Sequence, residues 1–285
     1  MSRRAFGVVN AIVLTAVVVL TLYPFVNVVA RSFSSEQYIQ AGQVNLWPRG
    51  FNTTTYRRVL GDPVFWTGYG NTVLYTVVAT AISMVLTTTY AYVLSKRHLK
   101  GRPVLVGIAV FTMFFNGGLI PNYVLVSSLG LRNSLWAIVL PNAISVFNLL
   151  VMKAFFEAMP AELEEAGAVD GLGTYGTLWH IVLPLSKAVV ATMTLFYAVS
   201  FWNSWFSAFL YLDDADLFPV TIYLRNLIAG ATGGTDISAP SDMTLQIAAN
   251  IQAVTIVLTA LPIVMVYPFI QRYFVTGVTL GAVKG

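Results

Sequence analysis

The sequence predicts an all-α integral membrane protein with six transmembrane helices. Hydrophobic residues make up 57% of the 285 residues and charged residues only 10%, a balance outside the usual range of soluble domains. Apolar runs of about 20 residues, the length that a helix needs to cross a bilayer, recur along the chain. Their expected bounds are Val8–Ala30, Asn71–Ser95, Val104–Leu125, Trp136–Ala154, Ala188–Leu212 and Asn250–Ile270.

The segments between these runs complete one membrane domain over residues 1–285, with no separate soluble module. A short helix is expected near Thr54–Leu60. Phe218–Ala229 is apolar, but it is too short to cross a bilayer and contains Arg225. We therefore expect an interfacial or re-entrant helix there.

The Lys and Arg residues predict how the chain is oriented in the membrane. With the N-terminus inside, ten of the sixteen lie in cytoplasmic segments, and the short loop KRHLKGR after the second span is the densest of these. Both termini and the segment Pro160–Pro184 are therefore expected in the cytoplasm. A cleaved signal peptide ending near Val28–Ala30 is the other interpretation of the first run, and it would upset this charge arrangement.

The sequence lacks residues that several classes of function require. The chain has no Cys, which excludes disulfides, thiol catalysis and cysteine–metal sites. Its basic residues are dispersed at the predicted membrane edges, whereas nucleic-acid binding needs a stripe or patch. No charged residue lies deep in a predicted span, which disfavours a proton-coupled pump or a voltage sensor. The sequence also contains no GxxxxGK[ST] phosphate-binding loop, so it predicts no ATPase site of that kind.

The most informative segment is polar and lies between the fourth and fifth spans. Pro160–Pro184 reads PAELEEAGAVDGLGTYGTLWHIVLP and holds four of the twelve acidic residues. Pro160 is expected at the first position of a helix, whose positive dipole end suits the acidic residues that follow. Asp170-Gly171 predicts the turn that ends this helix, and Thr174 the cap of a second helix. With Pro184 marking the junction to the fifth span, the segment forms a compact bracket on a membrane helix.

This bracket resembles the EAA motif of bacterial ABC importer permeases, which reads EAAxxDG and continues to IxLP. The matching residues are Glu165, Ala166, Gly167, Asp170, Gly171, Ile181, Leu183 and Pro184. Gly167 replaces the second alanine, and Ala188 stands near where many relatives have a proline, which makes a kink less expected there. The resemblance implies that residues 165–171 form a coupling helix that docks on a separate ATPase subunit.

Similarity to these permeases extends over nearly the whole chain, in the branch that takes up maltose and other sugars. Further matches are Asn71-Thr72, Ala91-Tyr92, Gly101-Arg102, Phe201-Trp202-Asn203-Ser204-Trp205 and the tail Gly281-Ala282-Val283-Lys284-Gly285. The segment 115–121, FNGGLIP, resembles a subgroup associated with oligosaccharide and uronide-type uptake. The resemblance implies the six-helix type I importer fold, also called MetI-like.

The resemblance implies a permease subunit for a carbohydrate, expected to be an oligosaccharide, in the inner membrane of a bacterial cell. Its expected partners are a second homologous permease, two ATPase subunits that bind ATP and magnesium, and an extracytoplasmic solute-binding protein. The chain itself is expected to bind no cofactor, metal or nucleic acid. The alternatives are a passive channel, which needs no bracket, and a membrane enzyme, which needs a nucleophile, metal set or paired carboxylates at membrane depth.

Polar and aromatic residues inside the spans are candidates for the carbohydrate path. Aromatic rings stack on sugar faces and amides bond hydroxyls, although helix packing and interhelical hydrogen bonds are the alternative roles. The candidates are Trp202, Asn203, Trp205, Asn148 and Asn116.

Two further groups of residues have alternative interpretations. The tail Gly281–Gly285 is expected either to contact the ATPase pair or to be a disordered terminus. Asp213, Asp214 and Asp216 suggest calcium, but they lack the glycine and distal glutamate of an EF-hand loop. We expect them to form a solvated outer face.

Overall fold

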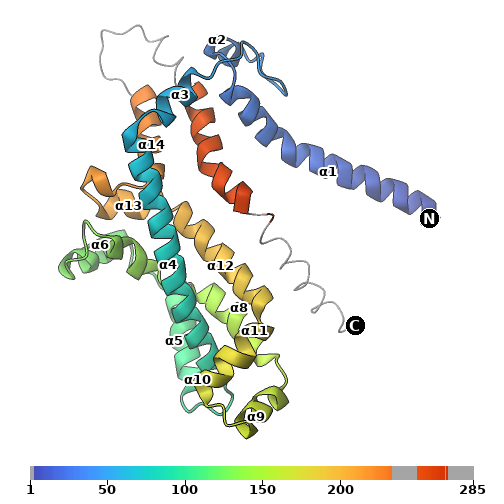
Figure 1. Ribbon diagram of the computed structural model, residues 1–285, viewed down its shortest axis with the longest axis vertical. Helices are drawn as coiled ribbons and strands as arrows, with labels where there is room; N and C mark the ends of the chain where they lie inside the picture. The colour runs from blue at the N-terminus through green and yellow to red at the C-terminus, as the bar shows by residue number, and fades with distance from the viewer. Residues whose placement is uncertain (1–2, 233–248, 267, 269–285) are drawn as a thin grey trace. The chain divides into compact units, whose positions relative to one another are not determined.

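The computed structural model describes residues 3–232, 249–266 and 268, whose regular elements are all helical (Figure 1). Contacts divide the chain into two compact units. Unit 1 comprises Met1–Thr67 with Ile222–Ile263, and unit 2 comprises Gly68–Thr221 with Val264–Gly285. The predicted all-α class is confirmed for the described residues.

Unit 1 contains the first and last predicted spans. Its helices are α1 (Arg3–Ser32), α2 (Glu36–Gln40), α3 (Thr54–Leu60), α14 (Val220–Thr232) from Ile222 onward, and the helix Ala249–Val266 up to Ile263. The α3 helix has the predicted bounds. From Phe6 to Val26 the side chains of α1 are exposed and mostly apolar, as a lipid-facing helix requires. The predicted end of the last span, from 267 to 270, lies outside the described residues apart from Pro268.

One asparagine ties the two spans of unit 1 together. The Asn250 side-chain amide donates to the backbone carbonyls of Arg31, Ser32 and Ser34, at 3.1, 3.3 and 3.0 Å. These carbonyls lie at and just after the end of α1, where helical partners are missing. The Glu36 carboxylate accepts a hydrogen bond from the Asn250 backbone N–H at 3.1 Å, and burial raises the pKa of this carboxyl.

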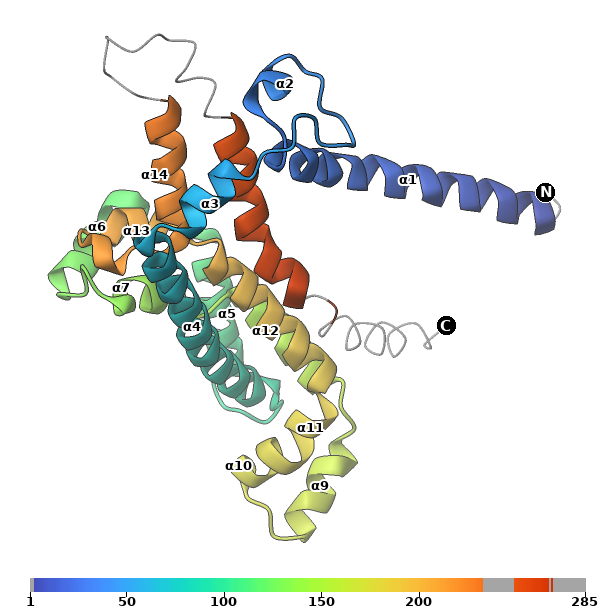
Figure 2. The same cartoon turned by 45° about the horizontal axis from the view of Figure 1, so that its top comes forward.

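Unit 2 holds the remaining membrane helices and the bracket. The long helix α4 (Pro63–Ser95) begins in unit 1 and continues through unit 2. The other elements are α5 (Arg102–Phe114), α6 (Leu119–Ser128), α7 (Leu135–Val139), η1 (Leu140–Asn142), α8 (Val146–Glu157), α9 (Ala161–Val169), α10 (Thr174–Thr177), η2 (Leu178–Val182), α11 (Leu183–Leu185), α12 (Lys187–Trp202), α13 (Trp205–Tyr211), η3 (Ala215–Leu217) and the start of α14 (Val220–Thr232). In Figures 1 and 2, α9 to α11 lie beyond the Ser95 end of α4, and α6 and α13 lie near the opposite end of unit 2.

The third predicted span is not one continuous helix. Helix α5 ends at Phe114 and α6 begins at Leu119, with a bend of 115° between them. Phe115 is extended, and Gly118 has a φ of +94°, a conformation that glycine adopts without a Cβ penalty. The side chain of Asn116 accepts from the Gly118 N–H at 2.9 Å and stabilises this break.

The fourth and fifth predicted spans are also interrupted. Helices α7 and α8 are separated by the 3₁₀ turn η1, which contains Pro141, and the two halves bend by 51°. In the fifth span α12 ends at Trp202 and α13 begins at Trp205, because the Asn203 side chain bonds the Val199 carbonyl at 2.8 Å and its backbone leaves the helix. The sequence prediction gave only the bounds of these three spans, and the structure adds a break inside each of them.

The core of unit 2 joins α4, α8 and α12. The Tyr197 hydroxyl on α12 bonds the Thr87 hydroxyl on α4 at 2.6 Å and accepts from the Ser145 N–H at 2.8 Å. Leu94, Leu149 and Met193 belong to the buried apolar cluster on the bracket side of this node. A buried hydroxyl with two partners and close-packed aliphatic neighbours fixes these three helices relative to one another.

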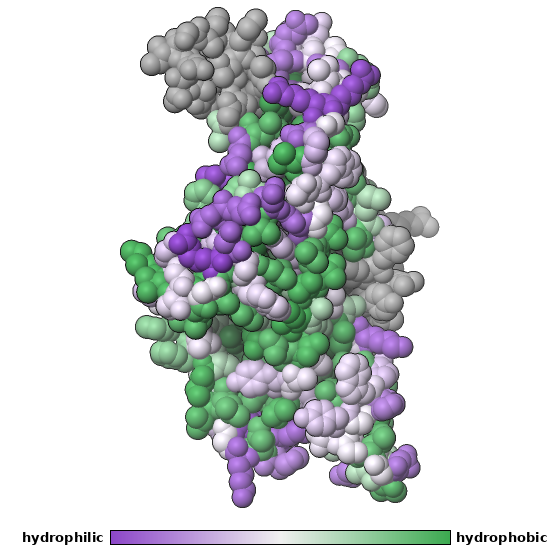
Figure 3. Space-filling view, turned by 60° about the vertical axis from the view of Figure 1, so that its left-hand side comes forward, coloured by the Kyte–Doolittle hydropathy of each residue, from purple (hydrophilic) through white to green (hydrophobic). Residues whose placement is uncertain are grey.

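Apolar side chains also cover much of the outside of unit 2. Figure 3 shows a broad hydrophobic region on one face and hydrophilic side chains at the lower end, where the bracket lies. Exposed apolar residues include Val77 and Val85 on α4 and Phe111 on α5. Soluble monomers rarely expose such large apolar patches, whereas lipid-facing helices require them.

Candidate functional site

The bracket, Pro160–Pro184, begins with the predicted helix, which starts one residue later than expected. Pro160 is the N-cap of α9, with an extended ψ of 132°, and Ala161 is the first helical residue. The prediction that Pro160 occupies the first helical position is therefore wrong by one residue. Glu162 and Glu164 lie in the first turn, where the helix dipole favours acidic side chains.

The predicted turn at Asp170-Gly171 is confirmed. Gly171 has a φ of +81°, the left-handed conformation that commonly follows a helix. The N–H of Leu172 donates to the Gly167 carbonyl at 2.9 Å, and the N–H of Gly171 donates to the Ala168 carbonyl at 3.1 Å. These bonds satisfy the last carbonyls of α9 and fix the direction in which the second arm leaves.

The second arm of the bracket is less regular than predicted. Gly173 occupies the cap position and Thr174 is the first residue of α10, so the prediction of Thr174 as the cap is wrong. Leu178–Val182 forms a π-helical turn, and Pro184 follows inside α11. Proline lacks the N–H of a regular helix, so its presence fits the wider turn before it.

The bracket meets the fifth span at a sharp bend. The arm Thr174–Leu185 and helix α12 are inclined by 86°, with Ser186 between them. The bend occurs although Ala188 replaces the proline of many relatives. Ser186 is fully buried. A rigid, buried elbow means that a displacement of the bracket moves α12 with it.

One face of the bracket is buried against the membrane helices. Leu178 and Val182 belong to the apolar cluster that contains Leu94 and Met152. Gly167 is buried, and a Cβ added there would lie 2.6 Å from Cδ1 of Ile181. The small residue at this motif position therefore lets the two arms of the bracket close on each other.

Ion pairs lie at the bracket end of unit 2, one of them to the bracket itself and another between α5 and the end of α8. Lys96, just after α4, pairs with Glu164 on α9, and its ammonium lies 3.9 Å from the centre of the Tyr92 ring. Arg102 pairs with Glu157 at the end of α8 and donates to the Leu94 carbonyl at 2.7 Å. We call the pair between Lys96 and Glu164 the latch, because it joins a membrane helix directly to the bracket.

The opposite face of the bracket is exposed and combines charged with apolar groups. The motif residues Glu165, Ala166 and Asp170 are exposed on α9 and the turn. Val169 is 88% exposed and Tyr175 is 78% exposed, which is unusual for such side chains in a water-facing segment. Sequence reasoning overlooked these apolar residues and Lys96, which it used only to orient the chain.

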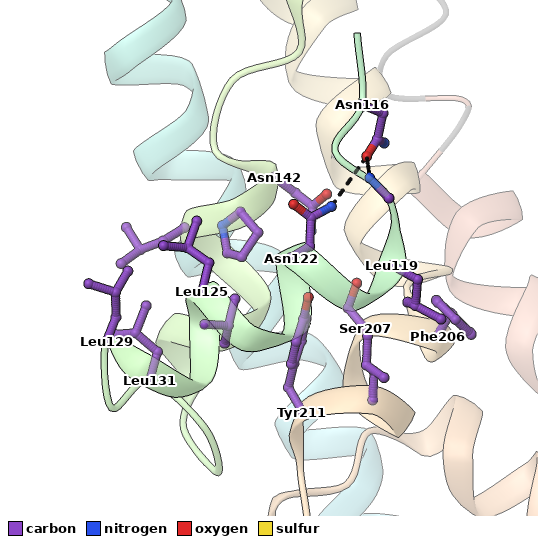
Figure 4. Close-up of a pocket in the computed structure, with 15 residues that line it drawn as sticks. Asn116, Leu119, Asn122, Leu125, Leu129, Leu131, Asn142, Phe206, Ser207 and Tyr211 are labelled. Atoms are coloured by element: carbon purple, nitrogen blue, oxygen red, sulfur yellow. Dashed lines mark hydrogen bonds between the residues drawn. The ribbon is translucent and has the colours of Figure 1, made fainter. Parts of the chain in front are cut away.

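A second feature of unit 2 is a cavity of about 680 Å³ bounded by α6, η1 and α13 (Figure 4). Asn116 lines it, together with Asn122 and Asn142. A smaller cavity of about 280 Å³ contains Asn148 and shares Asn142 with the larger one. Two of the predicted path residues thus border cavities, and sequence reasoning overlooked Asn122.

The other three predicted path residues lie outside the lining of these two cavities. Trp202 is buried, and its ring meets that of Tyr69 edge-on at 5.7 Å. The Asn203 amide bonds its own helix, and Trp205 lies against Phe206 and Phe209. A role for these residues in the carbohydrate path stays a prediction.

The acidic residues after α13 bond locally. Asp213 pairs with Arg132 at 2.7 Å, and the Asp214 carboxylate accepts from the Asp216 N–H at 3.0 Å. Asn133 accepts from the N–H groups of both Asp213 and Asp214. Among the described residues, no three His, Asp or Glu side chains are grouped so that they could hold a metal ion.

Apolar helices, a core that fixes three of them, and an exposed helical bracket are the features of a membrane-embedded protein with a docking element. The family described as "Binding-protein-dependent transport system inner membrane component" matches residues 98–280, which include the bracket. The chain belongs to this family. It is therefore an ABC transporter permease and not an enzyme, as predicted, and the rival predictions of a membrane enzyme or a passive channel are set aside.

The similar proteins span the whole chain. Protein LplC of Bacillus subtilis (strain 168) is 41% identical, over 99% of this chain and 96% of its own length. The polygalacturonan/rhamnogalacturonan transport system permease protein YtcP of the same strain is 38% identical over 100% of both chains. A chain in a crystal structure of a bacterial ABC transporter involved in the import of the acidic polysaccharide alginate matches with a TM-score of 0.83 and 34% identity, over 96% of this chain and 99% of that one. These full-length matches confirm the predicted permease fold.

Proposed function

We propose that this permease takes part in the ATP-driven import of a carbohydrate, most simply an oligosaccharide of the uronide type. The names of similar proteins support this class of substrate. One relative transports polygalacturonan and rhamnogalacturonan, another arabinooligosaccharides, and the matching crystal structure is of an importer of alginate.

The bracket is proposed to be the coupling element, and its two-faced construction is the observation that carries this proposal. Buried Leu178 and Val182 and the latch attach one face to the membrane helices. Glu165, Ala166 and Asp170 are exposed on the other face, available to an ATPase subunit. A rigid element attached on one side and docked on the other transmits motion, because packed interfaces move as units.

The exposed apolar side chains extend this docking face. Val169 and Tyr175 flank the Asp170-Gly171 turn. Exposed aromatic and aliphatic side chains surrounded by charged residues are typical anchors at the centre of a protein interface. In this proposal Gly167, Gly171, Ile181, Leu183 and Pro184 shape the bracket, whereas Glu165, Ala166 and Asp170 contact the ATPase.

The complete transporter is proposed to contain a second homologous permease, two ATPase subunits that bind ATP and magnesium, and an extracytoplasmic solute-binding protein.

The chain is proposed to cross a bacterial inner membrane six times with both termini in the cytoplasm. Three described helices are long and apolar enough to cross, and counting each bent pair as one span gives up to six. The loop of basic residues beside the latch supports a cytoplasmic bracket. The proposed ATPase contact of the tail Gly281–Gly285 lies outside the described residues.

Charge reversal at Glu165 tests the coupling role. Glu165→Lys leaves membrane insertion intact, because the side chain is exposed, and lowers co-purification of the ATPase subunits and coupled uptake roughly tenfold or more, the effect of opposing one interfacial charge. The measurement is affinity purification of the tagged permease from its native membrane, with partner identification by mass spectrometry, together with uptake of labelled oligosaccharide.

Glu162→Lys is the matched control, since it makes the same charge change on α9 outside the motif. It is expected to stay much closer to wild type. Unchanged coupled uptake in Glu165→Lys contradicts the coupling assignment, and recovery of the wild-type chain without any ATPase contradicts the proposed assembly.

A further inference from the structure

The larger cavity of unit 2 is built where three predicted spans break. The break after α5 supplies Asn116 and turns α6 away by 115°. The 3₁₀ turn η1 supplies Asn142, and α13 supplies Ser207 and Tyr211. Its volume of about 680 Å³ lies within the usual range of small-molecule sites, roughly 300–1,000 Å³.

Three asparagines give the cavity its polar character. The Asn116 carbonyl oxygen accepts from the Gly118 N–H at 2.9 Å and from the Asn122 amide at 3.3 Å. The Asn142 amide donates to the Ile138 carbonyl at 3.3 Å. Within the described residues, the side-chain oxygens of Asn122 and Asn142 accept no hydrogen bond. Figure 4 shows these two amides close together at the edge of the cavity.

Asn122 and Asn142 are exposed in this chain, so their side-chain oxygens are accessible to a polar ligand that enters the cavity. Sugar hydroxyls donate and accept, so they match amides well. Tyr211 adds an aromatic surface, held by the parallel ring of Tyr123 at 6.2 Å. A pocket with a few amides, hydroxyls and aromatic rings suits the apolar face and polar edge of a sugar ring.

The cavity lining carries no charged side chain. The nearest guanidinium along the chain, that of Arg132, lies over the Tyr123 ring at 5.4 Å and is paired with Asp213. A site that bound uronate carboxylates would need an uncommitted Arg or Lys within it.

We propose that this cavity is a neutral carbohydrate subsite in which Asn122 and Asn142 bond sugar hydroxyls and do not bind carboxylates. The inference rests on the proposed function and adds that different chains of the transporter bind the hydroxyls and the carboxylates of the substrate. Any carboxylates of an acidic oligosaccharide are bound by another chain of the transporter. Asn142 also borders the smaller cavity with Ser145 and Asn148, so hydroxyl-bonding groups continue beyond the first subsite.

Import by the complete transporter in proteoliposomes tests this inference. The probes are oligogalacturonide, alginate oligosaccharide and maltotriose, supplied with saturating binding protein. For the probe that the wild type imports, Asn122→Leu and Asn142→Leu each lower the sugar imported per ATP hydrolysed roughly 3- to 10-fold, the equivalent of one lost hydrogen bond. ATP hydrolysis stimulated by the binding protein is retained, which a merely structural defect would not allow.

Two further variants sharpen the result. Asn142→Asp keeps oxygen acceptors for hydroxyls, so it imports more sugar per ATP than Asn142→Leu, whereas a carboxylate site would make Asn142→Asp the worse variant. Ser128→Leu is the matched control, because Ser128 lies on α6 outside the cavity lining and bonds only its own helix. It is expected to match the wild type.

Each outcome decides one claim. A sugar-to-ATP ratio in Asn122→Leu and Asn142→Leu equal to wild type overturns the subsite. Loss of the second permease from these variants also overturns it, since the cavity would then be an interface between permeases. A wild-type transporter that hydrolyses ATP but imports none of the three carbohydrates contradicts the proposed function instead.

Discussion

The bracket and the cavity differ in whether their polar side chains are paired within the protein. In the bracket, charged groups that face the membrane helices are paired, as Lys96 is with Glu164, and the apolar face is buried. Around the cavity, helices break at Asn, Gly and Pro residues, and amide groups keep unused bonding capacity. Paired polar groups in a packed interface make an element rigid, whereas exposed amides beside a cavity are accessible to a polar ligand. This difference fits the two proposed roles, force transmission for the bracket and substrate contact for the cavity.

The largest expected effect comes from breaking the latch. Lys96→Glu places two carboxylates together at a site where the two side chains are only 17% and 34% exposed. The cost lies between about 1 kcal/mol for an exposed pair and about 3–5 kcal/mol for a buried one. Coupled import is expected to fall roughly tenfold or more, since about 1.4 kcal/mol corresponds to a factor of ten. Uptake and ATPase rates in proteoliposomes measure this loss.

A charge swap separates the latch from general damage. The double variant Lys96→Glu with Glu164→Lys restores much of the import, because the pair is re-formed with its charges exchanged. Arg97→Glu is the matched control, since it makes the same charge change at an exposed neighbouring position. If the double variant shows no recovery of import although it and the single variant both assemble with the ATPase subunits, the latch does not position the bracket.

A smaller effect is expected where the two arms of the bracket meet. Gly167→Val overpacks the contact with Ile181 and costs about 1–3 kcal/mol of local stability. Gly167→Ala costs less, because Cδ1 is the movable end of the Ile181 side chain, and Ile181→Val relieves it by removing that atom. Hydrogen–deuterium exchange of peptides covering 161–169 reports the loosening.

Gly173→Ala provides the comparison for this experiment. A Cβ at Gly173 meets no atom within 4 Å, so exchange in α9 is expected to stay near wild type. Equal exchange in Gly167→Val and Gly173→Ala would show that the arms do not close on each other as described.

Sequence patterns predicted those parts of the fold that depend on residues close together in the chain. Apolar length located α1 and α4, and Asp170-Gly171 located the turn of the bracket, because glycine allows the left-handed conformation found there. Hydropathy gave the bounds of the spans but not the breaks inside them, because it does not register an Asn side chain that bonds nearby backbone, as Asn116 and Asn203 do.

The candidate site was predicted only where its residues are neighbours in the sequence. The motif residues of the bracket lie within one short segment, so their spacing was readable. The latch joins Lys96 to Glu164, 68 positions apart, and the cavity assembles Asn122, Asn142 and Tyr211 from three breaks. Such contacts depend on tertiary packing, and no pattern in a single sequence specifies them.

The most direct test of the central claim uses the fact that the chain contains no Cys. Val169→Cys introduces a single thiol at the most exposed apolar position of the bracket, and its reaction with a maleimide is timed with and without the ATPase subunits. Gln43→Cys, exposed in unit 1 outside the bracket, is the control. The ATPase subunits are expected to slow labelling at Val169→Cys roughly tenfold or more and to leave Gln43→Cys unchanged, as a buried interface anchor requires. Equal labelling rates at Val169→Cys with and without the ATPase would contradict docking through the bracket.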